Sequence, residues 1–174
     1  MVHKALIVIS VLLIVFHTKS SLAEFGLFNR RDVQTVSTTD LLALLKNQRR
    51  AEVAARRVGD EIPRADFVLV DVRSSAEAGV SMIPGAVTKA YYERNRQKFQ
   101  GCAVIAYCTI GVRSETYARH LVENGVTARN YKGSILKWVS ANLPLMTPEG
   151  APTNRIHTYS DRYHAPDGYV QVTD

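Results

Sequence analysis

The sequence predicts an α/β protein with a sheet of about five mainly parallel strands and helices on both faces. Short apolar, β-prone segments alternate along the chain with segments of helical spacing, which is typical of a parallel sheet covered on both sides. Two of the predicted strands, residues 67–72 and 102–107, are largely apolar, which indicates burial within the sheet. A length of 174 residues suits one domain with a substantial core.

Residues 1–23 have the layout of a secretory signal peptide. Lys4 precedes a run over residues 5–16 that is apolar except for Ser10, and residues 21–23 (Ser-Leu-Ala) have the small-x-small form of a cleavage site. The run is shorter than the roughly 20 apolar residues that a membrane-spanning helix needs. We therefore expect cleavage before Glu24 and a periplasmic or secreted protein. The alternative is an uncleaved N-terminal anchor, and only in that case do we expect an association with the membrane.

The rest of the chain divides into three parts. Residues 24–37 are expected to form an irregular lead-in, residues 38–145 the folded domain, and residues 146–174 an irregular C-terminal tail. The tail holds several prolines and glycines and few aliphatic residues, which favours irregular structure.

The elements of the domain are predicted from hydrophobic spacing and from turn residues. A first helix begins at Thr39 or Asp40, which are N-cap residue types, and ends at Ile62-Pro63. The predicted strands cover residues 67–72, 102–107 and 128–131, and residues 83–87 are predicted to form a turn that leads into a short strand. The further helical segments cover residues 74–79, 91–99, 114–123 and 134–141.

The formal net charge is +6, but the charged residues are scattered. The densest basic run, residues 49–57, is interleaved with Glu52 and followed by Asp60, and a solvated helix face explains it better than a patch for polyanions or anionic lipids. Aromatic residues do not interleave with these arginines, so no nucleic-acid partner is predicted.

The two cysteines, Cys102 and Cys108, stand at the two ends of a predicted strand. Six residues at about 3.3 Å each separate their Cα atoms by about 20 Å, whereas a disulfide needs about 4.4–6.8 Å. We therefore expect two unpaired thiols, although export leads to an oxidising compartment. Cys102 is explained as a small buried residue, but Cys108 lies where the strand ends and calls for a functional explanation.

The segment after this strand is the candidate site, because ligand sites form at the carboxyl ends of parallel strands. Loop amides and the start of the following helix make a cradle for an anion, and Gly111 permits a backbone turn that a side chain would block. A cysteine at the base of such a cradle should have a lowered pKa, and Arg113 adds a planar positive fork. The candidate residues are Cys108, Thr109, Ile110, Gly111, Val112, Arg113 and Ser114.

This pattern resembles the single-domain, rhodanese-like sulfurtransferases over about residues 36–145. The matching motifs, in the order and spacing usual for that family, are Asp71-Val72-Arg73, Ile83-Pro84-Gly85-Ala86-Val87, Tyr107 through Ser114, Asn130 through Ile135, and Trp138-Val139. The chain departs from the family at Ser81-Met82, where Gly-His is usual, in a longer segment after the first helix, and in the tail after Pro144.

The resemblance implies a rhodanese-like fold and a two-step sulfur relay. Cys108 would take the outer sulfur of a small anionic donor such as thiosulfate, and loop amides would stabilise the persulfide. A thiol, cyanide or a protein would then accept the sulfur. Asp71 is expected either to brace Arg113 or to cap a turn, and Arg73 is interpreted as a surface residue.

Two other functions remain open at this point. One is a non-catalytic binding module on the same fold, which the retained Cys108 argues against. The other is a cysteine-based phosphatase or arsenate reductase. The related cell-cycle phosphatases place five residues between cysteine and arginine, whereas only four separate Cys108 from Arg113. The shorter loop favours a sulfur atom over a phosphate ester.

No metal site and no cofactor are predicted. His157 and His164 flank Asp161 in the tail, but the spacing is wide and a further ligand is missing. Trp138 is expected in the core. The three tail tyrosines are expected either to fold over the site or to pin the tail to the surface; they are Tyr159, Tyr163 and Tyr169.

Overall fold

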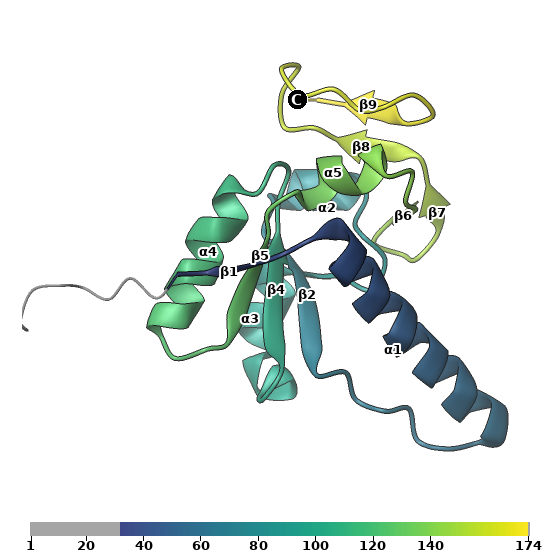
Figure 1. Cartoon of the computed structure of the whole chain (residues 1–174). Coiled ribbons are helices and arrows are strands. Elements are labelled where there is room, and N and C mark those ends of the chain that lie inside the picture. The colour runs from purple at the N-terminus through teal and green to yellow at the C-terminus, as the bar shows by residue number, and fades with distance from the viewer. Residues whose placement is uncertain (1–31, 174) are drawn as a thin grey trace, which may run out of the picture. The chain divides into compact units, whose positions relative to one another are not determined.

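The computed structural model describes residues 32–173, and it contains one five-stranded parallel sheet in the order β1-β5-β4-β2-β3. Every neighbouring pair in this sheet runs parallel. Helices cover the sheet on both faces (Figure 1). The predicted fold class is therefore confirmed. The predicted signal peptide, its cleavage site and most of the lead-in lie outside the described residues.

The elements of the main sheet and its helices follow the predicted order along the chain. The strands are β1 Gln34–Val36, β2 Phe67–Asp71, β3 Val87–Thr88, β4 Ala103–Tyr107 and β5 Ala128–Tyr131. The helices are α1 Thr38–Val58, α2 Ser75–Val80, α3 Lys89–Arg94, the 3-10 turn η1 Arg96–Phe99, α4 Val112–Glu123 and α5 Ser134–Ser140.

Alternate residues of the central strands point into two separate cores. On one face, Leu69 and Ile105 pack with residues of α1 and α5. On the other face, Val70 and Val104 pack with residues of α3 and α4. This two-residue period is the geometry of an extended strand, and each fully buried aliphatic side chain contributes about 1.5–3 kcal/mol. Trp138 is buried in the first of these cores, as predicted.

The lead-in is the first point at which the structure differs from the prediction. Residues 34–36 form the edge strand β1, which pairs in parallel with β5. Ser37 then caps α1, because its hydroxyl accepts from the amide of Asp40 at 3.1 Å. The helix ends at Val58, four residues before the predicted end at Ile62, and Gly59 follows it with a positive φ of 78° that turns the chain away.

The tail, predicted to be irregular, carries short strands. These are β6 Leu145–Met146 with β7 Pro152–Thr153, and β8 Arg155–His157 with β9 Val170–Val172. Ile156 is fully buried within the first core, and the hydroxyl of Tyr169 donates to the Leu143 carbonyl at 2.7 Å. The tail is thus folded onto the domain, although two- and three-residue strands leave no periodic signal in the sequence.

Both cysteines have free thiols, as predicted. They stand at opposite ends of β4, and the Cys102 thiol contacts the Ala65 carbonyl oxygen at 3.4 Å. Within residues 32–173, no helix combines the length and the apolar character needed to cross a membrane.

Candidate active site

The candidate site forms where β4 ends and α4 begins. Cys108 follows the last residue of β4, and α4 starts at Val112, two residues earlier than predicted. Arg113 and Ser114 therefore belong to the first helical turn rather than to the loop. Gly111 precedes the helix with a φ of 101°, and a Cβ atom on it would lie 2.1 Å from the backbone oxygen of Lys132. Only glycine fits this close approach.

The sulfur of Cys108 lies inside a ring of donors. The Gly111 amide donates to Sγ at 3.1 Å, and the hydroxyls of Ser114 and Ser134 lie 3.5 and 3.9 Å from it. Ser134 also accepts from the Cys108 amide at 3.0 Å, which fixes the base of the loop. With 1% of its surface exposed, Cys108 depends on these groups in place of water.

These donors decide the charge state of Cys108. Burial by itself raises the pKa of the thiol, but hydrogen bonds from the Ser114 hydroxyl and from the amides of Ser114, Gly111 and Ile110 outweigh burial. The pKa therefore lies below its ordinary value. The positive end of α4 points at the same sulfur and favours the same charge. The arrangement suits a reactive thiolate.

Asn130 of β5 ties the loop to the helix. Its side-chain oxygen accepts from the Ser114 hydroxyl at 2.7 Å, and its amide nitrogen donates to the Gly111 carbonyl at 3.1 Å. Ser114 has one hydroxyl hydrogen, and its contact with Asn130 is much shorter than its contact with Cys108. The backbone amides are thus the more constant donors to the sulfur. In the sequence, Asn130 is noted only as part of a motif. Its two contacts show that it links the cysteine loop to α4.

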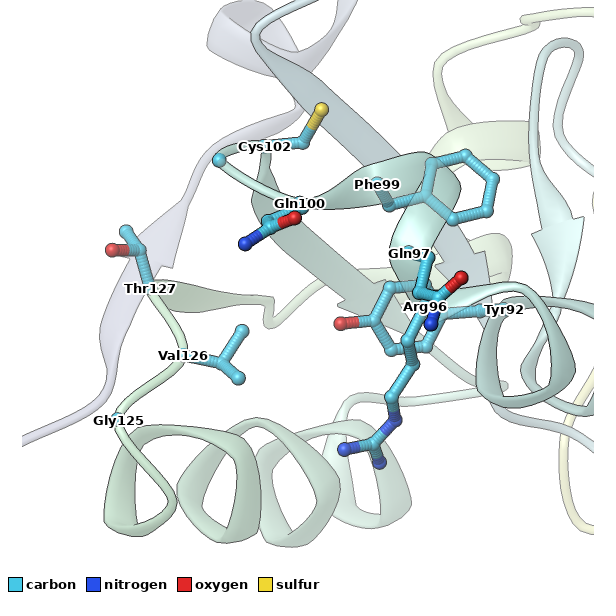
Figure 2. A pocket seen from close by; sticks show the side chains of 10 residues that line it. Tyr92, Arg96, Gln97, Phe99, Gln100, Cys102, Gly125, Val126 and Thr127 are labelled. Atoms are coloured by element: carbon cyan, nitrogen blue, oxygen red, sulfur yellow. The ribbon is translucent and has the colours of Figure 1, made fainter.

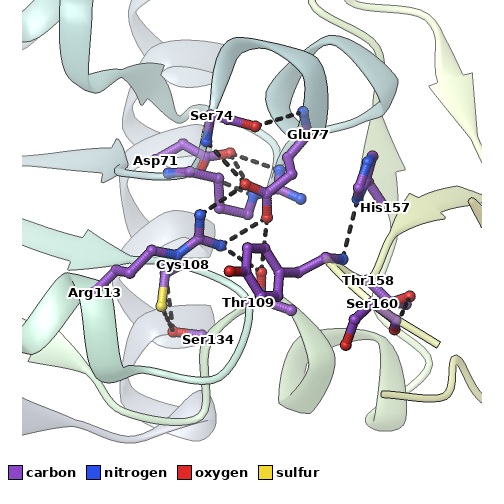
Figure 3. Close-up of polar contacts among 12 residues, drawn as sticks. Asp71, Ser74, Glu77, Cys108, Thr109, Arg113, Ser134, His157, Thr158 and Ser160 are labelled. Atoms are coloured by element: carbon purple, nitrogen blue, oxygen red, sulfur yellow. Dashed lines mark hydrogen bonds and ion pairs between the residues drawn. The ribbon is translucent and has the colours of Figure 1, made fainter. Parts of the chain in front are cut away.

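The guanidinium of Arg113 is held by Glu77 of α2 (Figure 3). Nη1 and Nη2 each donate to one carboxylate oxygen at 2.7 Å, and Nη2 also donates to the hydroxyl of Thr109 at 2.9 Å. Thr109 in turn donates to Glu77 at 3.0 Å. Glu77 is 2% exposed and Arg113 is 38% exposed, so the pair lies at the edge of the buried region.

Glu77 was missed by the sequence analysis. Burial raises the pKa of its carboxyl, but hydrogen bonds from Arg113 and Ser74 lower it by more. The pKa of Glu77 therefore falls from 4.5 to about 2. The local signal was present in Ser74-x-x-Glu77, because the two side chains form a capping box at the start of α2. That signal predicts a helix start, and only the packing of α2 against the loop brings Glu77 to Arg113.

Asp71 does not brace Arg113. It instead binds Arg73, with Nε at 2.9 Å from Oδ1 and Nη2 at 2.6 Å from Oδ2. Oδ1 also accepts from the Arg73 amide at 3.0 Å, which is the turn cap considered as the alternative. The expectation that Arg73 lies on the surface is wrong, because the residue is 6% exposed.

The Asp71–Arg73 pair is a buried support for the neighbouring strand ends. Tyr107 donates to Asp71 at 2.8 Å and accepts from the Ile83 amide at 3.2 Å, while Arg73 donates to the Ser81 carbonyl. Burial lowers the pKa of Arg73, but the Asp71 carboxylate raises it well above its ordinary value, so the guanidinium stays charged. This cluster connects β2, β4 and the turn before β3, and it holds the floor of the site.

The remaining predicted site residues have less central side chains. Ile110 and Val112 point outward and are exposed, so only their backbone belongs to the cradle. Tyr159 of the tail lies over Arg113, with its ring centroid 4.9 Å from Cζ, and Tyr169 pins the tail as described above. No cluster of metal-ligating residues is present in the described part of the chain, and His157 accepts from the Tyr159 amide at 3.0 Å.

A surface pocket of about 570 Å³ lies at the other end of β4 (Figure 2). Tyr92, Phe99, Gln100, Cys102 and Val126 are among its lining residues. The sulfur of Cys102 points away from Gln100 and Val126 in Figure 2 and contacts the segment before β2. The pocket is thus separated from Cys108 by the length of a strand.

The fold agrees with the comparisons to known proteins. The family model described as a rhodanese-like domain matches residues 52–141, so the chain belongs to the rhodanese-like family. A sulfurtransferase from Allochromatium vinosum is 31% identical over 108 residues, which cover 60% of this chain and 98% of that protein. A tRNA uridine(34) hydroxylase from Ruegeria pomeroyi is 30% identical over 90 residues, or 46% of this chain and 30% of that protein.

Solved structures agree on the fold. A thiosulfate sulfurtransferase from Pseudomonas aeruginosa has a TM-score of 0.52 and 20% identity, covering 70% of this chain and 21% of that one. A Rhodopseudomonas palustris protein described as a possible tyrosine phosphatase also has a TM-score of 0.52, with 23% identity over 66% of this chain and 86% of that one. The family match and the Allochromatium relative support a sulfurtransferase-type function, with sulfur donors and acceptors as substrates.

The close approach at Gly111 can be tested with Gly111→Ala. The added Cβ would collide with the Lys132 backbone oxygen, so we expect the free energy of unfolding to fall by about 1–3 kcal/mol in urea denaturation. Alkylation of Cys108 at neutral pH should also slow, because the Gly111 amide leaves the sulfur. The matched control is Gly59→Ala, which has a φ of 78° but nothing within 4 Å of a Cβ. Equal effects of the two changes on alkylation would contradict the cradle.

The Glu77–Arg113 pair should appear in the pH dependence of stability. The pKa of Glu77 is lowered from 4.5 to about 2, so its contribution is complete above pH 4.5 and is lost as the pH falls towards 2. Glu77→Gln should lower the free energy of unfolding by about 1–3 kcal/mol at neutral pH, and the deficit should shrink over that acid range in urea titrations. Glu93→Gln, which removes an exposed partner of Lys89, is the control. A deficit that stays constant down to pH 2 would refute the assignment.

Proposed function

We propose that the chain moves sulfane sulfur from a donor such as thiosulfate to a thiophilic acceptor through a persulfide on Cys108. The observation that carries the proposal is the cradle around Sγ, with the Gly111 amide at 3.1 Å and the start of α4 directed at the sulfur. Such donors stabilise negative charge on Sγ and on a sulfur atom attached to it.

Both steps are displacements at sulfur. In the first, the Cys108 thiolate forms a bond to the outer sulfur of thiosulfate, and the old sulfur–sulfur bond breaks with its electron pair leaving on sulfite. In the second, a thiol, cyanide or a protein nucleophile bonds to the outer sulfur of the persulfide, and Sγ leaves as a thiolate. The electron pairs come from the reactants, and the loop amides need only hold the anionic form of Cys108 at each stage.

Arg113 supports the donor step. Its bonds to Glu77 and Thr109 use three of the five guanidinium N–H groups. The remaining groups are available to sulfonate oxygens of the donor, which carry the charge that leaves with sulfite. Because Glu77 balances the charge of Arg113, the guanidinium contributes mainly through the direction of its hydrogen bonds to the donor and less through its net charge.

Loop size favours sulfur over phosphate. Four residues separate Cys108 from Arg113, and the Gly111 amide lies 3.1 Å from Sγ. For so short a loop, we expect the cradle to admit one additional sulfur atom rather than a tetrahedral ester. Thiosulfate satisfies this limit, since only its outer sulfur must reach the base. The intact cysteine and its donors equally disfavour a module that only binds.

We also propose that the protein is exported, on the basis of the apolar run over residues 5–16 and the Ser-Leu-Ala segment before Glu24. N-terminal sequencing of the protein from a periplasmic or culture fraction should begin at Glu24. An intact Met1 recovered with the membrane fraction would show that the segment is kept as an anchor.

The persulfide itself is the decisive test of the proposed function. After incubation with thiosulfate, intact-mass spectrometry should show one added sulfur atom, which cyanide removes as thiocyanate. Cys108→Ser should abolish both signals. Cys102→Ser, the matched control, should retain most of the activity, because Cys102 lies at the far end of β4, and should lose only about 1 kcal/mol of stability. Hydrolysis of aryl phosphates that requires Cys108, without a persulfide, would replace this proposal with a phosphatase.

A further inference from the structure

The C-terminal tail contributes a side chain to the candidate active site. The ring of Tyr159 lies over the guanidinium of Arg113, 4.9 Å from Cζ to the ring centroid. Figure 3 shows the neighbouring tail residues His157, Thr158 and Ser160 beside the network of Glu77 and Arg113. Tyr159 is 58% exposed, so its ring is not held there by burial in a core.

The backbone at Tyr159 adopts a rare conformation. Its φ is 70°, in the left-handed region that a tyrosine rarely adopts. The strain is held by a local bond, because the Tyr159 amide donates to His157 Nδ1 at 3.0 Å. Strained residues of this kind persist where surrounding structure over-determines them, and they concentrate at functional sites.

The turn that carries Tyr159 is anchored on both sides. Before it, Ile156 is fully buried in the core, and the Thr158 amide donates to the Val172 carbonyl of β9 at 3.1 Å. After Tyr159, the Thr158 hydroxyl donates to the Ser160 carbonyl at 3.1 Å. The tail therefore presents the ring from a fixed base rather than from a loose end.

The ring completes the enclosure of Arg113. Glu77 and Thr109 contact the edge of the guanidinium through hydrogen bonds. The ring of Tyr159 contacts one face of the guanidinium instead, and it attracts the cation from a direction that the hydrogen bonds do not cover. The ring adds no charge, so it orients Arg113 without altering the charge balance at Cys108.

We propose that Tyr159 is a positioning residue of the donor site, which keeps Arg113 in the plane that meets the oxyanion of an anionic sulfur donor. The inference rests on the proposed sulfur transfer. It concerns a residue beyond the matched family region, which ends at residue 141. The tail of this chain thus adds to the site a contact that the cysteine loop does not supply.

The test compares Tyr159→Asn with Tyr159→Phe. Asparagine tolerates the left-handed backbone but removes the ring, whereas phenylalanine keeps the ring and loses only the hydroxyl. For Tyr159→Asn, the KM for thiosulfate should rise about three- to tenfold, the change expected from a cation–π contact at a partly exposed site, while kcat changes by less than about twofold. Tyr159→Phe should resemble the wild type. Tyr163→Asn, in the same tail, is the control and should also match the wild type.

A binding measurement separates this inference from the proposed function. Calorimetric titration of thiosulfate into Cys108→Ser, with and without Tyr159→Asn, needs no turnover. Three- to tenfold weaker binding in the double variant supports the positioning role even if the wild-type chain forms no persulfide, in which case only the proposed function fails. Equal affinity, no binding to either protein, or a Tyr159→Phe enzyme that behaves like Tyr159→Asn would overturn the inference.

Discussion

A negative charge on a sulfur that water barely reaches is the constraint on which this site depends. Cys108 is 1% exposed, so a thiolate there is stable only if the protein provides donors that are already in place. The Gly111 amide and the first turn of α4 meet that need. The Ser114 and Ser134 hydroxyls lie farther from the sulfur, and each makes a shorter bond to another acceptor, Asn130 and the Tyr131 carbonyl respectively. The hydrogen bond from Asn130 to the Gly111 carbonyl and the close approach of Gly111 to the Lys132 backbone hold those donors in position around the sulfur.

Two acid–arginine pairs surround this centre, and they differ in what they do. Asp71 and Arg73 are both fully buried and join strand ends, so the pair acts as part of the framework. Glu77 is buried but Arg113 reaches the surface, so this second pair keeps a cation at the border of the site. Each arginine has its own carboxylate, and Arg113 also interacts with the sulfur of Cys108. Because Glu77 already balances most of the charge of Arg113, a thiolate at Cys108 depends on further groups. The backbone amides of the loop and the N-terminal end of α4 are the groups that stabilise the negative charge on Cys108.

The sequence predicted the features that local patterns determine. Apolar strands alternating with helices gave the parallel sheet, and a cysteine at the end of a buried strand followed by Gly111 gave the loop. It missed β1 and the tail strands because pairs of two or three residues carry no measurable period. It left two roles open for Asp71, a brace for Arg113 and a turn cap, because Asp71 and Glu77 are both acidic and near in sequence; Asp71 caps the turn and Glu77 binds Arg113. Only the packing of α2 against the loop distinguishes them.

The same reasoning explains why the tail could not be interpreted from its composition. Its prolines and glycines indicate turns, yet one buried isoleucine, Ile156, and the Tyr169 hydroxyl are enough to fix it on the domain. Once it is fixed, a tyrosine in a strained turn is carried to the guanidinium of Arg113. The matched family region holds the cysteine loop, whereas the tail lies outside it and changes what surrounds the arginine. An uncharged ring is well suited to that place, because a further cation would compete for Glu77 and a further acid would repel an anionic donor.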